Sequence, residues 1–250
     1  AGPDGTLPDL PGTMTMGEYG PKTGLPRILQ LLDDYDIKAS FFVPGYVAET
    51  HPDMVRDLVA RGHEVAHHGY MHESPAELTI DREREVLEKG IDILVKLTGE
   101  KPKGYRAPSW DMSKYTGSLL AEYGFLYDSS LMDDDAPYIW HTEGGDLVEL
   151  PIHWLLDDFP YYGYAPAFNL RGPMCSPVSV FKTWAAEFDG LYKEGRCYIL
   201  TTHPQIIGHP GRLSGLERTV QHIRTHPNVK FMRTVDIAEY WVSRGSSQEG

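Results

Sequence analysis

The feature that most constrains the fold is a regular alternation of two hydrophobic patterns along the 250 residues of the chain. Short apolar runs such as Ala39–Val43 are typical of buried strands, and this one stops at the turn-forming pair Pro44–Gly45. Other segments, such as Leu25–Leu32, repeat apolar residues at helical spacing. Because helical crossovers join parallel strands, the alternation predicts an α/β fold with a mainly parallel sheet.

About seven strands are expected from this alternation. They are Ala39–Val43, His63–His67, Gly104–Ala107, Phe125–Asp128, Asp146–Leu150, Tyr198–Thr201 and Val229–Met232. Helices are expected around 52–61, 80–97 and 212–225 and after Thr23, Ser113, Ser176 and Thr234, whereas the Gly/Pro-rich opening, 1–16, is typical of a loop. A closed barrel and an open doubly wound sheet both fit, and in both of them chemistry collects at the carboxyl ends of the strands. No flexible linker interrupts the repeat, so we expect one domain over residues 1–250.

Composition excludes several functional classes. Lys plus Arg number 23 against 36 Asp plus Glu, a net charge of −13 that argues against nucleic acid or an anionic membrane as a partner. No apolar run approaches the roughly 18 residues that a membrane span needs. The two cysteines are too few for a disulfide framework. No secretory signal is visible, which favours a cytoplasmic location.

Several polar residues follow the expected strands. His68 and His72 come directly after one strand, and two converging imidazoles are a common beginning for a zinc, iron or nickel site. The alternative is a solvated histidine-rich loop. Arg106 follows the next strand and could pair with a catalytic carboxylate or form a buried salt bridge, and Trp110 could line a substrate site or belong to the core. His203 ends a later strand and suits a general acid.

Three strings together resemble the polysaccharide deacetylase (NodB-homology) superfamily, and most closely its allantoinase-like and peptidoglycan-deacetylase-like branch. The strings are His68–Glu73, Arg106–Asp111 and Tyr127–Met132, and Leu200 to His203 matches a further motif loosely. The resemblance implies a distorted (β/α) barrel of metal-dependent amidases. The family's first strand carries an Asp pair, a base and a third metal ligand, for which nothing before Thr23 is a clear match. We therefore expect that strand to be missing from this sequence and to precede Ala1.

The resemblance also implies roles for individual residues. His68 and His72 would hold a divalent metal, with zinc the first choice, Arg106 would tune the base, and His203 would protonate the departing nitrogen. Substrate contacts are expected from Tyr70, Trp110, Asp111 and Trp154.

The expected reaction is hydrolysis of a non-peptide carbon–nitrogen bond, with N-deacetylation of a carbohydrate as the first choice. A cytoplasmic enzyme of this branch could instead open a small cyclic amide such as an imide, a hydantoin or an allantoin-like ureide. A closed pocket under the segment 157–164 would favour the small molecule, and a long groove the polymer. A sugar-binding relic without catalysis is the third alternative. The branch also favours a homo-oligomer.

Overall fold

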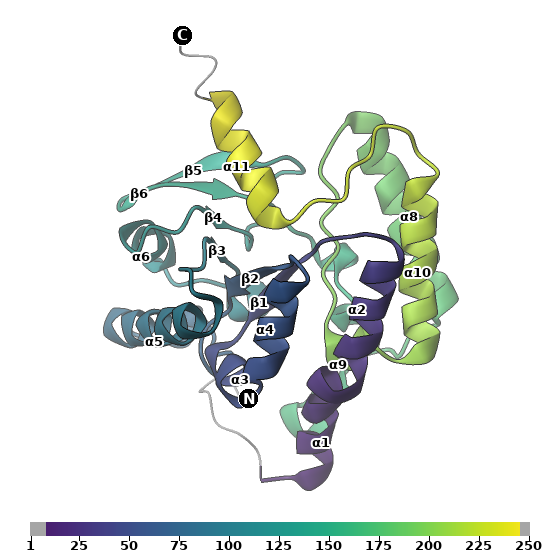
Figure 1. The fold of residues 1–250 in the computed structure, drawn as a ribbon, viewed down its shortest axis with the longest axis horizontal. Helices are drawn as coiled ribbons and strands as arrows, with labels where there is room; N and C mark the ends of the chain where they lie inside the picture. Colours follow the sequence, from purple (N-terminus) through teal and green to yellow (C-terminus); the bar gives the residue numbers. More distant parts are fainter. Residues whose placement is uncertain (1–8, 246–250) are drawn as a thin grey trace. The chain divides into compact units, whose positions relative to one another are not determined.

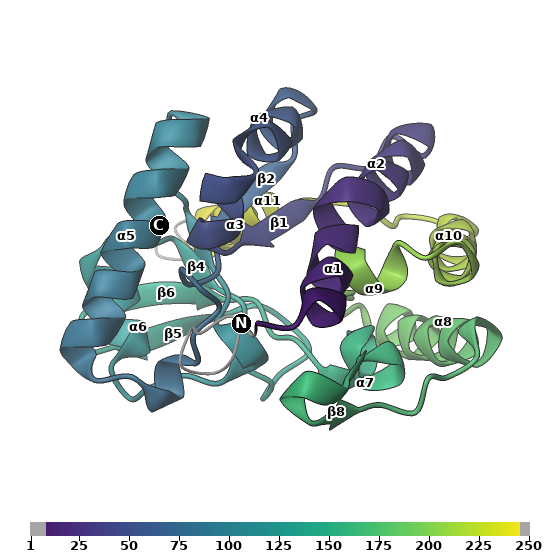
Figure 2. The same cartoon turned by 90° about the horizontal axis from the view of Figure 1, so that it is seen from below.

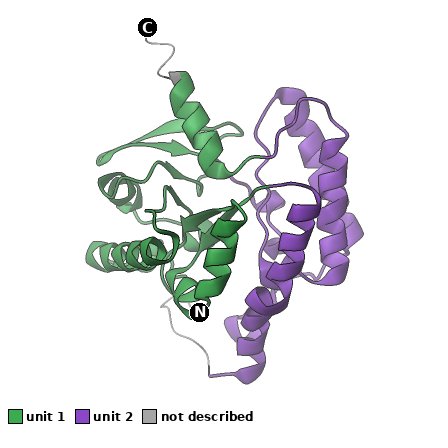
Figure 3. Cartoon of the chain, in the orientation of Figure 1, with its two compact units in different colours: residues 1–7, 38–151, 232–250 green, residues 8–37, 152–231 purple. Residues whose placement is uncertain are grey.

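The computed structural model describes residues 9–245, which form two compact units (Figure 3). The first unit contains Lys38–Pro151 and the chain from Met232 to the end of the described residues. The second contains the described residues up to Ile37 and the segment Ile152–Phe231. The chain therefore passes twice through each unit, so neither of them is a continuous stretch of sequence.

A six-stranded sheet forms the centre of the first unit (Figure 1). Its strands are β1 (Ser40–Val43), β2 (Glu64–His67), β3 (Gly104–Tyr105), β4 (Tyr127–Asp128), β5 (Tyr138–Thr142) and β6 (Gly145–Glu149). The order is β1-β2-β3-β4-β6-β5, and all neighbours run parallel except β5 and β6, which form an antiparallel hairpin. The predicted α/β fold with a mostly parallel sheet is confirmed.

Five helices in the described part of the first unit pack on this sheet or on one another. They are α3 (Gly45–Thr50), α4 (Pro52–Ala60), α5 (Ile80–Thr98), α6 (Thr116–Glu122) and α11 (Thr234–Gly245). Helices α4 and α5 pack on β2, while α6 and α11 pack on β6. The core beneath α5 and α6 includes Leu87, Tyr105, Leu120 and Leu147, all at most 2% exposed. Burial of apolar surface of this kind stabilises the fold by roughly 25 cal/mol per Å².

The first turn of α11 is bound to a buried carboxylate. Glu64 Oε2 accepts hydrogen bonds from the Val235 backbone N–H and the Thr234 hydroxyl, both at 3.0 Å. Glu64 Oε1 accepts from the Tyr127 hydroxyl at 2.9 Å, and the Thr234 N–H donates to Ser40 Oγ at 2.8 Å. A negative charge at a helix N-terminus satisfies amides that have no partner within the helix and complements the helix dipole. The last helix is thereby fixed to β1, β2 and β4.

The second unit is mainly helical. Its helices are α1 (Pro11–Tyr19), α2 (Leu25–Asp34), α7 (Phe159–Tyr162), α8 (Pro177–Glu194), α9 (Pro204–Ile207) and α10 (Pro210–Arg224), with a π-helical turn at Gly20–Gly24 between α1 and α2. The short strands β7 (Tyr164–Ala165) and β8 (Leu170–Arg171) form a hairpin. Helices α8 and α10 lie side by side (Figures 1 and 2). None of the helices in the described part of the chain is long and apolar enough to cross a membrane.

Glycine allows two segments of the second unit to touch. A Cβ at Gly24 would lie 2.0 Å from the carbonyl oxygen of Pro204, and one at Gly208 would lie 2.3 Å from the Cα of Gly24. No other residue type fits so close to a neighbouring backbone. The close approach fixes α9, which begins directly after His203, against the start of α2.

Three sequence expectations differ from the structure. Residues 11–16 form part of α1 rather than a loop. The expected strands Tyr198–Thr201 and Val229–Met232 are not strands; Thr201 makes only an isolated parallel bridge with Asp157. The main sheet within residues 9–245 therefore has six strands rather than about seven, with β1 and β5 at its edges, so closure into a distorted barrel stays a prediction.

Candidate functional site

The carboxyl ends of four parallel strands form one polar edge in the first unit. The register pairs His67 with Tyr105, Tyr105 with Asp128, and Asp128 with Glu149. Because these partners lie in one row, the residues that follow them along the chain leave the sheet together. Ligand sites of parallel α/β proteins form at this edge.

His68 and His72 lie against each other at this edge, as the sequence predicted. Their ring centroids are 4.9 Å apart and the ring planes are inclined by 80°. His68 Nδ1 lies 2.7 Å from the carbonyl oxygen of Arg106, so Nδ1 carries the proton and Nε2 presents its lone pair. A second group that fixes the tautomer in this way is typical of histidines that bind metals.

The loop between the two histidines has an unusual backbone. Gly69 has a φ of +69° and His72 one of +65°, and the latter is strained for a residue with a side chain. Buried Glu73 holds the loop by accepting from the backbone N–H groups of Tyr70 at 3.1 Å and Met71 at 2.7 Å. Backbone strain kept by surrounding contacts clusters at functional sites.

His67, the last residue of β2, is fully buried and stays neutral. Its Nδ1 accepts from the Gly69 N–H at 3.2 Å, and its Nε2 lies 3.2 Å from the carbonyl oxygen of Leu87. Burial lowers the pKa of His67 to about 4, more than the Leu87 hydrogen bond raises it. The uncharged ring supports the turn that presents His68.

The donor set of the pair fits a divalent transition metal in part. Two imidazole nitrogens suit zinc, iron, cobalt or nickel, and such sites take a third protein ligand. Within residues 9–245, His68 and His72 belong to no group of three histidine, cysteine or carboxylate ligands. The described residues thus provide two nitrogen ligands at the strand edge.

Arg106 is buried and bonded to the loop after β4. Its Nε donates to the carbonyl oxygen of Ser129 at 2.9 Å and its Nη2 to the Ser129 hydroxyl at 2.6 Å. The guanidinium lies 4.2 Å from the centre of the Phe42 ring, a cation–π contact. Arg106 therefore ties the ends of β1, β3 and β4 together. Whether it also acts on a catalytic base stays a prediction.

Two buried carboxyls that the sequence analysis did not assign to the site lie at the same edge. Asp128 and Glu149 are both fully buried, and neither Asp128 Oδ2 nor Glu149 Oε2 has a hydrogen-bond partner within the described residues. Burial raises the pKa of Asp128 to about 6. Burial, followed by the nearby charge of Asp128, raises the pKa of Glu149 well above its ordinary value. Two carboxyls this close favour sharing a proton.

This carboxyl pair shapes the loops beside Arg106. Glu149 Oε1 accepts from the N–H groups of Ser130 at 3.1 Å and Leu131 at 3.0 Å. The Ser130 hydroxyl donates to Asp128 Oδ1 at 2.9 Å and accepts from the Ala107 N–H at the same distance. The string Tyr127–Met132 indicated this carboxyl in the sequence, because Asp128 ends a buried strand and a buried acid needs hydrogen-bond donors from the loop that follows.

The predicted substrate residues of the first unit differ in exposure. Trp110 is buried and has a φ of +57°, whereas Asp111 is exposed and accepts from the Met112 N–H at 3.0 Å. Tyr70 is half-buried, its hydroxyl donates to Glu49 at 2.9 Å, and the Lys89 ammonium lies 3.5 Å from its ring centre. Their substrate roles stay predictions.

In the second unit, His203 is held by a buried carboxylate that sequence reasoning missed. The backbone N–H of His203 donates to Asp158 Oδ2 at 3.0 Å, and its Nδ1 donates to Asp158 Oδ1 at 2.7 Å. The side chain of Asp158 is fully buried, while that of His203 is 30% exposed. Asp157 lies farther away, at 3.9 Å from Nδ1, and accepts from the Phe159 N–H at 2.6 Å.

The geometry of the Asp158–His203 pair suits proton transfer. With Nδ1–H committed to the carboxylate, Nε2 is the nitrogen that gains or releases a proton. The carboxylate also stabilises the imidazolium form and fixes the ring orientation, as in other Asp–His pairs. In the sequence, two adjacent acids, Asp157 and Asp158, in an otherwise aromatic segment were the indication that a carboxylate has a role here. Trp154, from the same segment, is 43% exposed.

Comparisons with known proteins identify the family of the chain. Residues 14–127 match the family model for polysaccharide deacetylase. The chain is 32% identical to the peptidoglycan deacetylase of Helicobacter pylori, over 94% of this chain and 89% of that protein. The chain therefore belongs to the polysaccharide deacetylase family and is a hydrolase of carbon–nitrogen bonds other than peptide bonds.

Two solved structures resemble the chain along most of its length. A crystal structure of a putative polysaccharide deacetylase from Mycobacterium smegmatis has a TM-score of 0.91 and 42% identity, covering 94% of this chain and 82% of that one. The structure of Puue allantoinase has a TM-score of 0.84 and 32% identity, covering 93% and 76%. The chain is thus similar both to a polysaccharide deacetylase and to an allantoinase, the two kinds of protein that the sequence resembled.

Proposed function

We propose that the chain removes N-acetyl groups from a carbohydrate by hydrolysis of the amide bond. The Asp158–His203 pair carries this proposal, because amide hydrolysis needs a positioned proton donor for the departing nitrogen. The similarity to the peptidoglycan deacetylase supports the choice of a sugar substrate.

A divalent metal, with zinc as the first choice, is assigned to His68 and His72 in this proposal. When bound, such an ion polarises the amide carbonyl and lowers the pKa of water. Neighbouring residues hold these two histidines in place. The Arg106 carbonyl fixes the tautomer of His68, and Glu73 fixes the loop that carries His72.

His203 is assigned the role of general acid. An amine leaves as a neutral molecule only if its nitrogen is protonated as the carbon–nitrogen bond breaks, and the Nε2–H of an imidazolium supplies that proton. Asp158 favours the charged ring and prevents it from rotating, since it accepts from both Nδ1 and the backbone N–H. Arg106 is assigned to tune the charge of the base.

A second candidate is hydrolysis of a small cyclic amide. The likeness to Puue allantoinase, at 32% identity, favours it. The same proton donor would serve, because opening a ring amide also releases a nitrogen. The two candidates differ in substrate size and not in the assigned residues, so a substrate panel separates them.

The test compares wild type with His203→Gln and Asp158→Asn on N-acetylglucosamine oligomers, peptidoglycan fragments and allantoin. We expect wild type to release acetate from the sugars. His203→Gln should lower kcat by about 10²–10⁴-fold and Asp158→Asn by a smaller factor, with metal content unchanged. The exposed pair His141–Asp146, also 2.7 Å apart, offers matched controls: His141→Gln and Asp146→Asn should keep full activity.

The outcomes separate the hypotheses. Turnover of allantoin alone would replace the sugar proposal by the cyclic-amide one. Full activity of His203→Gln would refute the acid role. No turnover of any substrate together with no bound metal would indicate a non-catalytic sugar-binding relic. A cytoplasmic location and a homo-oligomeric state stay predictions, which cell fractionation and light scattering test.

A further inference from the structure

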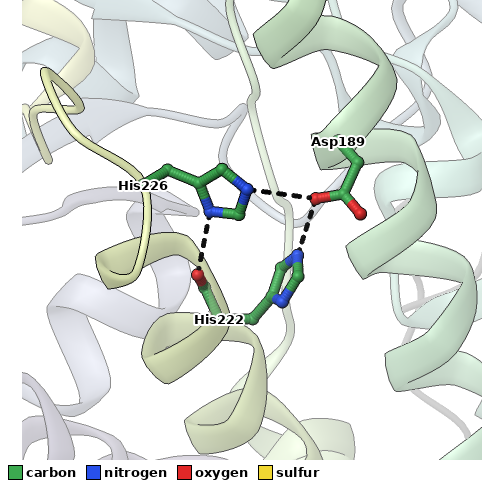
Figure 4. Close-up of side chains that lie close together, drawn as sticks. All are labelled: Asp189, His222 and His226. Atoms are coloured by element: carbon green, nitrogen blue, oxygen red, sulfur yellow. Dashed lines mark hydrogen bonds and ion pairs between the residues drawn. The ribbon is translucent and has the colours of Figure 1, made fainter.

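A second group of side chains that could bind a metal ion lies in the second unit. Its residues are distant in the sequence from His68 and His72. Asp189 projects from α8, His222 from the last turn of α10, and His226 from just beyond the end of that helix (Figure 4). Figure 4 shows both imidazole rings turned toward the same carboxylate oxygen. The family resemblance assigned no role to any of the three.

The three ligand atoms have the spacing of a metal site. His222 Nε2 lies 2.7 Å from Asp189 Oδ1, and His226 Nε2 lies 3.5 Å from the same oxygen. All three atoms lie within 4.8 Å of one another. In a tetrahedral zinc site with bonds of about 2.0–2.1 Å, ligand atoms are about 3.3 Å apart. The two distances to Asp189 Oδ1 lie on either side of that value, and the two histidine nitrogens lie at most 4.8 Å apart.

The hydrogen bonds of His226 determine which of its nitrogens carries the proton. The Thr225 hydroxyl donates to the carbonyl oxygen of His222 at 2.7 Å, so its proton is committed there. His226 Nδ1 lies 3.1 Å from that carbonyl and 3.2 Å from the Thr225 hydroxyl oxygen, and both of these can only accept. Nδ1 therefore carries the proton, as it does in metal-binding histidines that bond a backbone carbonyl.

This assignment leaves two acceptors facing each other. Unless the ring is doubly protonated, His226 Nε2 presents a lone pair to the Asp189 carboxylate across 3.5 Å. Such an arrangement is repulsive without positive charge between the atoms. The charge is either an additional proton on the ring or a metal ion held jointly with His222.

The surroundings hold the rings while leaving them accessible. The Phe188 ring packs edge-on against His222 at 5.9 Å and His226 at 5.0 Å, and Tyr192 packs against His226 at 4.8 Å. These contacts restrict ring rotation. The ligand side chains are nevertheless 23–40% exposed, so an ion can enter from solvent and keep a water ligand.

We propose that Asp189, His222 and His226 bind a divalent transition-metal ion, of which Zn²⁺ is the best match, and that the ion cross-links α8 to α10. Two imidazoles and one carboxylate form a common protein donor set for zinc, with water as the fourth ligand. The ion would stabilise the packing of these helices, because it binds the folded unit and a preformed site is absent from the unfolded chain.

The experiment measures zinc binding to the full chain after chelator treatment and dialysis. Isothermal titration with Zn²⁺ and metal analysis should give one more equivalent for wild type than for His222→Gln/His226→Gln. At zinc 100-fold above Kd, the Tm of wild type should rise by about 5 °C or more, whereas that of the variant should not. Asp189→Asn should weaken binding while its far-UV circular dichroism matches wild type.

Two controls separate this site from the proposed catalytic metal. His68→Gln/His72→Gln should retain the α8–α10 equivalent and the Tm shift, and His141→Gln should behave as wild type. The proposal is wrong if wild type and His222→Gln/His226→Gln bind the same number of equivalents, or if His68→Gln/His72→Gln abolishes all binding. In either case the cluster is a protonated ion pair only. Because binding is measured without turnover, the result does not depend on the proposed deacetylation.

Discussion

The buried carboxyl of Asp128 allows a stability prediction whose size follows from the structure. In the unfolded chain its pKa is near the ordinary value of 3.8, and burial raises it to about 6 in the folded protein. Each tenfold change in a protonation equilibrium is worth about 1.4 kcal/mol, so ionised Asp128 destabilises the fold by about 3 kcal/mol. The sign follows from proton counting: the folded state binds more protons, so its stability falls as pH rises from 3.8 to 6.

Asp128→Asn removes this charge and keeps an oxygen that can accept from the Ser130 hydroxyl. Its new amide can also donate to Glu149, which now has an oxygen without a partner. We expect the stability of the variant relative to wild type to rise between pH 4 and pH 8, by an amount on the order of 3 kcal/mol that includes the response of Glu149. Urea unfolding followed by circular dichroism across this pH range measures the difference.

The control is Asp53→Asn, because the side chain of Asp53 is 97% exposed and its ion pair with Arg56 lies on the surface. Its effect should stay below about 0.5 kcal/mol at every pH. An Asp128→Asn variant whose stability relative to wild type falls between pH 4 and pH 8, or does not change with pH, would contradict the reasoning.

Two further substitutions, Gly90→Ala and Arg106→Lys, test packing beside the site, and Gly190→Ala in the second unit is a control. A Cβ at Gly90 would lie 2.1 Å from His67 Nε2, so Gly90→Ala should destabilise the protein by more than about 2 kcal/mol. Gly190 in α8 has open space around it, so Gly190→Ala should stabilise the protein by about 0.5–1 kcal/mol. Thermal unfolding measures both effects. Arg106→Lys loses the forked bonds to Ser129 and should lower the free energy of unfolding by about 2 kcal/mol, measured in urea; an unchanged midpoint would show that the fork is dispensable.

The sequence was most informative about the central parallel strands and the residues that directly follow them. The strands ending at His67, Tyr105 and Asp128 were predicted within one or two residues, because each is a short segment between a helical pattern and a turn. The meeting of His68 and His72 followed from a single loop. Local pattern is sufficient for such features, since few distant contacts decide them.

Features that depend on distant contacts were not predictable. The apolar run at Tyr198–Thr201 was expected to be a strand, yet Thr201 forms only one bridge, and no periodicity reveals whether a neighbour is present to pair with it. Asp158 meets His203 across 45 positions of sequence. Helix α1 contains Gly12 and Gly17, which disfavour helices when considered locally, and none of its residues is buried, so neither propensity nor an apolar stripe indicated it.

The carboxylate of Glu64 also has a consequence for how the polypeptide matures on the ribosome. Glu64 accepts one hydrogen bond from the Thr234 hydroxyl and one from the Val235 backbone N–H. Both residues are synthesised after the entire Ile152–Phe231 segment. Until they emerge from the exit tunnel, the nascent sheet contains an acidic group that is not fully neutralised by hydrogen bonds. Completion of the first unit therefore waits for residues that follow the whole Ile152–Phe231 segment.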